Sequence, residues 1–327
     1  MLDVFRTDAF GLVQLTMAMQ NLPYKPGRLG EMGLFSTKGI NSTTVVIEEQ
    51  SGKLHLLPTA ARGTMPRFDA GRKRKARAFE VPHIPFNDAV MADEVQGVRA
   101  FGTEDQTETV AEIVNSKLET MRQSHEVTHE WHRIGSIQGK VLDADGISVL
   151  VDIFDEFGVV EPTTEWDFSA SLRPQIQVLQ RMLADALGAI PYTGIVGMCG
   201  AEFFDALVAC EEIRETWLWL GNQQVTETQR QEGFVWGGIK WEEYYGHIGS
   251  QEFIPAAVCR FVLTGVPDLF LQQWAPANFI ETVNTIGVPV YAKQKIMDFD
   301  TGVELHTQSN PFTMCTRPAT LVKGTLK

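Results

Sequence analysis

The stretch 103–135, TEDQTETVAEIVNSKLETMRQSHEVTHEWHRIG, decides the shape of the protein because it predicts one long helix. Thr103 and Gln106 fit a capping box at its start, and Gly135 is a typical stop. Helical spacing relates the apolar residues Val110, Ile113, Val114, Leu118 and Met121, and a shifted stripe continues through Val127, Trp131 and Ile134. A helix over about 104–135 would measure about 46 Å, which exceeds the width of a small domain.

A basic, extended segment at 41–85 precedes this helix. Residues 43–47 (TTVVI) favour a strand, 58–72 are rich in Gly, Pro and Arg, and 77–84 form a second extended run. No helical periodicity appears in these roughly 40 residues. Because a compact domain rarely contains so much unsupported chain, the segment is either disordered or an arm that lies on another molecule.

The sequence after the helix alternates between strand and helix signals and predicts an α+β domain with a central sheet. Asp143 to Gly146 (DADG) has the composition of a hairpin turn. Helices are expected at 172–187, closed by Gly188, and at 201–210, and strands at 194–199, 234–244, 257–263 and 288–297.

Composition narrows the class of protein further. The 327 residues include 28 Lys and Arg against 41 Asp and Glu, a net charge of −13 that argues against a protein whose main role is to coat DNA or anionic membrane. The longest mostly apolar stretch, 182–201, is interrupted by Asp185 and Pro191, so we expect no membrane span. The four cysteines form no CxxC pair and are expected to be reduced and buried.

Charge is unevenly distributed along the chain. Residues 41–80 carry an excess of basic side chains, whereas 141–250 carry a large excess of acids. Such asymmetry suits a self-complementary assembly in which the basic part of one copy meets the acidic part of the next, although it can also serve solubility alone. The candidate inter-subunit contacts are Arg62, Arg67, Arg72, Lys73, Arg74, Lys75 and Arg77.

Two motifs offer alternative functions. His125-Glu126-Val127-Thr128-His129 matches HExxH, in which two histidines bind zinc and the glutamate is the general base of a hydrolase. Its metzincin extension is absent, because His132 and Gly135 stand where that motif has Gly and His, so a partly exposed helix face is the simpler interpretation. The basic run 72–77 allows nucleic-acid binding, but few aromatic residues flank it. No cofactor is indicated.

The order of a basic arm, a long helix, a hairpin and an α+β domain, together with specific strings, resembles the major capsid proteins of lambda-type tailed bacteriophages. The strings are PHIPFND at 82–88, EVQGVRAFG at 94–102, and Thr128, Glu130, Arg133, Gly135, Gly139 and Lys140 leading into VLDADG at 141–146.

The resemblance implies an α+β chain with the tailed-phage capsid fold of the Hong Kong 97 type. It places an N-terminal arm at 1–40, an extended β-loop at 41–85, a peripheral domain with its spine helix (about 104–135) at 86–164 and an axial domain at 165–310. Residues 311–327 would return to the peripheral domain, with a strand over 316–322.

The family's function is structural and not enzymatic. Its members form hexamers and pentamers that close into an icosahedral shell around phage double-stranded DNA, without reading its sequence. Scaffold and portal proteins, and in some relatives a decoration protein, are the expected partners. The expected location is the virion capsid, with assembly in the host cytoplasm.

Overall fold

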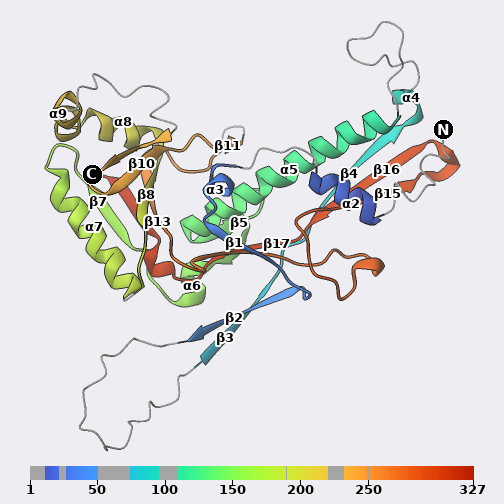
Figure 1. Ribbon diagram of the computed structural model, residues 1–327, viewed down its shortest axis with the longest axis horizontal. Helices are drawn as coiled ribbons and strands as arrows, with labels where there is room; N and C mark the ends of the chain where they lie inside the picture. The colour runs from blue at the N-terminus through green and yellow to red at the C-terminus, as the bar shows by residue number, and fades with distance from the viewer. Residues whose placement is uncertain are drawn as a thin grey trace, which may run out of the picture.

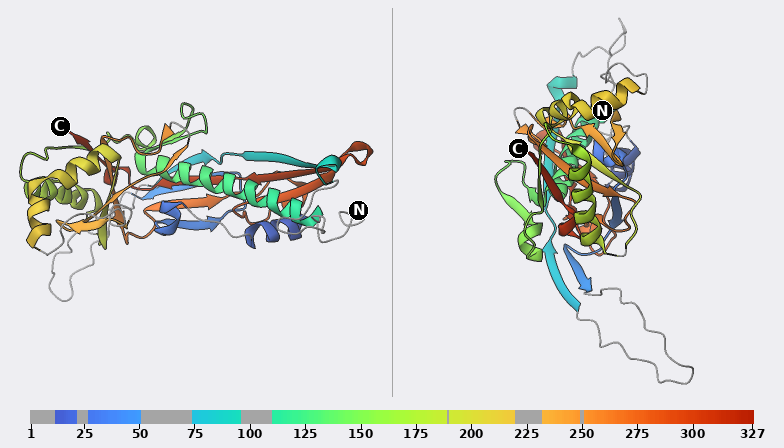
Figure 2. Two further views of the ribbon diagram at one scale, coloured as in Figure 1. Left: turned by 90° about the horizontal axis from the view of Figure 1, so that it is seen from above. Right: turned by 90° about the vertical axis from the view of Figure 1, so that its left-hand side faces the viewer.

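The computed structural model describes residues 12–21, 27–50, 74–95, 110–188, 190–219, 232–248 and 251–327, and shows an elongated molecule (Figures 1 and 2). Its α-helices are α2 (Leu12–Asn21), α3 (Arg28–Glu31), α4 (Ala92–Val95), α5 (Val110–Gln138), α6 (Ile153–Phe157), α7 (Leu172–Leu187), α8 (Ala201–Ala209) and α9 (Glu211–Trp219). No helix in these ranges is both long and apolar enough to cross a membrane.

Strands in several small sheets accompany the helices. They are β1 (Phe35–Gly39), β2 (Thr44–Gln50), β3 (Arg74–Glu80), β4 (Ile84–Met91), β5 (Lys140–Leu142), β6 (Val149–Asp152), β7 (Thr163–Trp166), β8 (Gly194–Cys199), β9 (Phe234–Trp236), β10 (Ile239–Glu243), β11 (His247–Ile248), β12 (Gln251–Glu252), β13 (Val258–Thr264), β14 (Phe270–Trp274), β15 (Tyr291–Ile296), β16 (Gly302–Ser309), β17 (Pro311–Cys315) and β18 (Val322–Leu326).

One end of the molecule is an α+β body built on a six-stranded sheet in the order β7-β18-β13-β8-β10-β9 (Figure 1). Trp166, Trp241 and Phe261 from three of its strands pack with ring centroids 5.4–5.6 Å apart. The apolar stripe of α7 is buried as its spacing predicts, and Gly188 ends the helix at a φ of 67°.

The long helix α5 runs along the molecule away from this body (Figure 1). It is longer at its carboxyl end than the sequence predicts, because it continues through Gly135 and ends at Gln138. Gly135 is required for packing instead: a Cβ there would lie 2.7 Å from the Lys140 carbonyl oxygen. The true stop is Gly139, at a φ of 85°. The expected residues 104–109 lie outside the described part of the chain.

The elongated part consists of α5 with two three-stranded sheets, β1-β14-β17 and β15-β16-β4. A separate apolar core forms where α2 and α5 meet the second sheet, and it includes Met19, Val114, Leu118 and Leu305. Val127 is 46% exposed, because the helix turns polar residues toward the sheets at this point.

The strands β2 and β3 form a hairpin that leaves the body beside β1 (Figures 1 and 2). Seven residue pairs join them, from Thr44↔Glu80 to Gln50↔Arg74, so the paired part spans about 23 Å. Phe79 fixes the hairpin's base, since its ring lies 5.5 Å from that of Phe312. The strand expected at 43–47 is therefore present, and it is longer.

The strands in the C-terminal part of the chain belong to different sheets. The block 165–310 is not continuous with one sheet, because β14, β15 and β16 lie along α5 while β18 returns to the six-stranded sheet beside β13. No strand spans 316–322, where Pro318–Thr320 forms a 3-10 turn. The expected strand 234–244 is two strands joined at Gly237 and Gly238, both with positive φ.

Candidate functional site

The predicted basic contacts are concentrated on the β2–β3 hairpin and the segment that joins its strands. Arg62, Arg67, Arg72 and Lys73 lie outside the described residues, and Arg74 and Lys75 belong to β3. Arg77, nearer the base, is half-buried, and its guanidinium carbon lies 4.6 Å from the centroid of the Phe157 ring in the same chain. That cation–π contact anchors the base of the hairpin to its own body.

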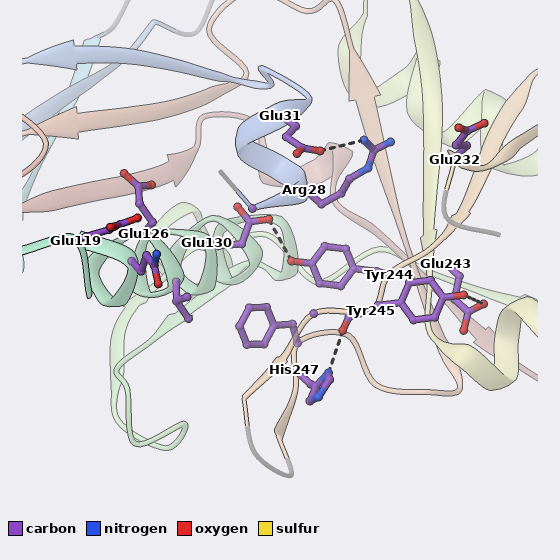
Figure 3. A pocket seen from close by; sticks show the side chains of 15 residues that line it. Arg28, Glu31, Glu119, Glu126, Glu130, Glu232, Glu243, Tyr244, Tyr245 and His247 are labelled. Atoms are coloured by element: carbon purple, nitrogen blue, oxygen red, sulfur yellow. Dashed lines mark hydrogen bonds and ion pairs between the residues drawn. The ribbon is translucent and has the colours of Figure 1, made fainter. Parts of the chain in front are cut away.

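An acid-lined hollow of about 1000 Å³ lies between α3, α5 and the segment that follows β10 (Figure 3). Six glutamates line it against one arginine, Arg28, and one histidine, His247. Its carboxyl groups come from four parts of the chain: Glu31, Glu119, Glu126, Glu130, Glu232 and Glu243. Tyr244, Tyr245 and Phe253 supply the apolar part of the wall.

Some of these glutamates hold the hollow together. Glu130, which is buried, accepts hydrogen bonds from the Leu29 amide (2.7 Å) and the Tyr244 hydroxyl (3.1 Å), and Arg133 lies 3.3 Å away. Glu130, which lies on α5, therefore links α3 to Tyr244, the residue that directly follows β10. Burial, reinforced by Glu130, raises the pKa of Tyr244 well above its ordinary value, so Tyr244 keeps its proton and remains a donor.

Arg28 closes the opposite side of the hollow. Its Nη2 lies 2.7 Å from Glu242 Oε2 and its Nε donates to Glu242 Oε1 at 3.2 Å, a two-pronged contact with a buried carboxylate. The hydrogen bond with Glu242 raises the pKa of Arg28. Glu31 lies 3.7 Å from the same guanidinium, so this one cation serves two carboxylates.

Other glutamates of the hollow are available for a ligand. Glu119 on α5 and the exposed Glu232 have no hydrogen bond or ion pair with any residue in the described ranges. Glu243 accepts a hydrogen bond from the Tyr245 hydroxyl at 2.9 Å. An excess of carboxylates in a concave site attracts cations, and basic side chains are the cations that a partner protein supplies.

The histidines of the HExxH sequence are structural. His125 and His129 are buried, and their Nε2 atoms lie 3.0 Å from Thr307 Oγ1 and 2.7 Å from Ser309 Oγ on β16. The expected partly exposed helix face is therefore wrong: α5 buries this polar face against β16 and β17. Glu126 Oε2 lies 3.6 Å from His129 Nδ1.

Burial keeps these imidazoles neutral. It lowers the pKa of His125 to about 4 and that of His132 to about 4, and the pKa of His129 falls in the same direction. Across the described parts of the chain, no group of three His, Cys, Asp or Glu side chains could hold a metal ion. The zinc-hydrolase alternative gains no support from this geometry.

The sequence indicated only part of the hollow. Glu232 and Glu243 fall in the acid-rich range 141–250, but Glu31, Glu119 and Glu130 come from α3 and α5. The local sequence does not indicate that the glutamates of α3 and α5 share a site, because only the packing of α3 on α5 brings them together.

Comparison with known proteins agrees with the arrangement of hairpin, long helix and α+β body. The phage major capsid protein E family matches residues 11–326. The major capsid protein of Pseudomonas phage KPP10 is 25% identical over 342 residues, covering 96% of both chains, and that of Salmonella phage Felix O1 is 25% identical over 357 residues, covering 96% of this chain and 95% of the relative.

Solved structures extend the likeness to the fold. The mature capsid of bacteriophage PhiM1 superposes with a TM-score of 0.53 at 13% identity over 94% of this chain and 89% of that chain. The empty GTA particle gives 0.52 at 9% identity over 94% and 91%. The fold is the tailed-phage capsid fold of the Hong Kong 97 type, as the resemblance implied. The chain belongs to the phage major capsid protein E family, and its role is that of a structural protein of the virion capsid.

Proposed function

We propose that copies of this chain join when the basic hairpin of one copy lies on the acid-lined hollow of the next. Repeated around a ring, this contact would build the hexamers and pentamers of an icosahedral head shell that encloses phage DNA. Two observations carry the proposal: the extended loop 41–85, whose strand pair leaves its own body, has an excess of basic residues, and a concave, acidic surface lies elsewhere on the same chain.

Several weak contacts suit this task better than one strong contact. Exposed ion pairs contribute about 0.2–1 kcal/mol each, so several pairs give a contact that forms and breaks while a ring corrects errors. Glu119 and Glu232 can take part without loss of internal contacts among the described residues. Glu130 and Glu242 are already engaged within the chain.

The expected domain names carry over as part of the proposal. Residues 1–40 serve as the N-terminal arm, 41–85 as the extended loop, α5 as the spine of a peripheral domain and the six-stranded body as the axial domain. Scaffold and portal proteins, with or without a decoration protein, join the shell during assembly in the host cytoplasm. The acidic surface repels phosphate, so DNA is enclosed without sequence-specific binding.

Charge reversal in the hairpin tests the proposal. The double variant Arg72→Glu/Arg74→Glu is expected to abolish shells in electron micrographs while the circular dichroism of the subunit stays unchanged. The matched control is Arg173→Glu/Arg181→Glu, which makes the same charge change on the exposed face of α7. Normal shells from the hairpin variant would refute the proposal.

A charge swap identifies the receiving surface. Glu119→Lys/Glu232→Lys alone is expected to impair assembly, and combining it with Arg72→Glu/Arg74→Glu is expected to restore part of it, because opposite charges then face each other again. Failure of the swap, with both double variants folded, would show that the hairpin contacts another surface.

A further inference from the structure

Three aliphatic side chains form an exposed ridge on the segment between β14 and β15. Ile280 is 91% exposed, Val283 65% and Ile286 69%. Successive hydrogen bonds of the 3-10 type, Val283 N to Ile280 O and Thr285 N to Thr282 O, hold this segment. The 3-10 turn covers Ile280–Thr282, Val283 is extended and Asn284 has a φ of 60°, so the three exposed side chains follow one another along one short irregular loop.

The ridge is fixed in place by the rest of the chain. The buried Thr282 hydroxyl donates to the Ala277 carbonyl at 2.6 Å, the Gly287 amide donates to the Ile40 carbonyl at 2.8 Å, and the Val288 amide donates to the Tyr291 hydroxyl at 3.1 Å. The exposure of the aliphatic side chains is therefore built into an ordered segment. Apolar patches held out in this way mark contacts with other molecules.

The charge beside the ridge is neutralised within the chain. Glu281 lies 2.7 Å from Lys293 Nζ, and that ammonium also lies 5.1 Å from the centroid of the Phe279 ring. The surface consequently presents aliphatic groups without net charge. Such chemistry fits an apolar protein surface and gives no attraction to nucleic acid or to an anionic membrane.

The position of the ridge points to its occupant. The ridge segment contacts Gly39 and Ile40, which precede the β2–β3 hairpin in the sequence. Figure 1 shows the ridge segment beside the base of the hairpin. On the hairpin itself, Val46 is 59% exposed. The ridge segment therefore adjoins the part of the chain that leads into the hairpin.

We propose that the ridge of Ile280, Val283 and Ile286 is an apolar contact onto a second copy of this chain, formed together with the hairpin contact. This inference rests on the proposed function, since it needs the copies to meet at the hairpin. In this proposal, burial of the ridge holds two copies together at the base of the hairpin, and the basic run 72–77 adds charge.

The test uses Ile280→Ser/Val283→Ser in the full chain. Ile286 is left intact because its Cγ2 packs against Gly39. The substituted side chains are exposed, so the unassembled subunit should keep its melting temperature and circular dichroism. The critical concentration for shell formation is expected to rise about tenfold for each aliphatic group lost. Ile147→Ser, at an 82% exposed site on the β5–β6 turn, is the matched control.

A photo-crosslink identifies the occupant. Val283→Cys carrying a benzophenone is expected to link to peptides of a second copy in assembled shells. Crosslinks only to a different protein, or assembly of the serine variant at the wild-type concentration, would overturn the inference. If Arg72→Glu/Arg74→Glu blocks assembly while the serine variant assembles normally, the ridge fails and the proposed function stands. If the hairpin variant forms normal shells, the proposed function fails.

Discussion

Acid should unfold this protein through the three buried histidines of α5. Burial lowers the pKa of His125 from 6.5 to about 4, so the folded state favours the neutral imidazole. The unfolded chain therefore binds more protons between pH 6.5 and pH 4. The stabilisation is fully present above pH 6.5 and is lost as the pH falls through 4.

The size of the effect follows from the shift. A change of 2.5 pH units corresponds to about 3 kcal/mol for His125, and His132 adds a similar amount. The ring centroids of His125 and His129 lie 6.3 Å apart, so a proton on one ring raises the cost of a proton on the other. Because a domain is stable by only about 5–15 kcal/mol, acid should remove a large share of the total.

His125→Gln isolates one of these groups. Glutamine can still bond to Thr307 but takes up no proton, so the variant should lose about 2.5 kcal/mol less stability than wild type between pH 7 and pH 4.5. Urea unfolding of the unassembled subunit, followed by circular dichroism at several pH values, measures this difference. His247→Gln, at an exposed site, is the control for removal of an imidazole. Equal pH slopes for His125→Gln and wild type would refute the reasoning.

Three further substitutions test the fold and are measured by urea unfolding of the unassembled subunit. Phe299→Asn should stabilise by about 0.5–1 kcal/mol, because the exposed Phe299 has a φ of 61° that asparagine tolerates better; a loss of stability would contradict this. Gly139→Ala should destabilise by about 1–3 kcal/mol, because φ is 85° and the new methyl group meets Phe154; an unchanged midpoint would show that this contact relaxes. Glu130→Gln should lower the free energy of unfolding by about 3–5 kcal/mol, because it replaces a carboxylate that bonds the Leu29 amide and faces the buried Arg133. A decrease below about 1 kcal/mol would show that Glu130 does not hold the walls of the hollow together.

Elements governed by local chemistry could be predicted from the sequence. The apolar stripe and Gly188 define α7, the apolar run 194–199 is β8, and the Asp143–Gly146 turn joins β5 to β6. In each case the residues that predict the element lie within the element or next to it.

Features that depend on distant partners could not be predicted. Nothing near 322–326 indicates that β18 pairs with β13, since that pairing is set by the whole sheet. The polar face of α5 looked exposed because its residues are charged or carry imidazoles. It is buried because hydroxyl groups on β16 bond the Nε2 atoms of His125 and His129 across about 180 residues of sequence. The acid-lined hollow likewise forms only when α3 packs on α5.

A cryo-electron microscopy map of the assembled shell tests most directly whether one copy's hairpin contacts the next copy. The expected result is density for the basic hairpin of each copy over the neighbour's hollow, close to Glu119 and Glu232. A hairpin folded back onto its own body, or lying far from that hollow, would contradict the proposed contact.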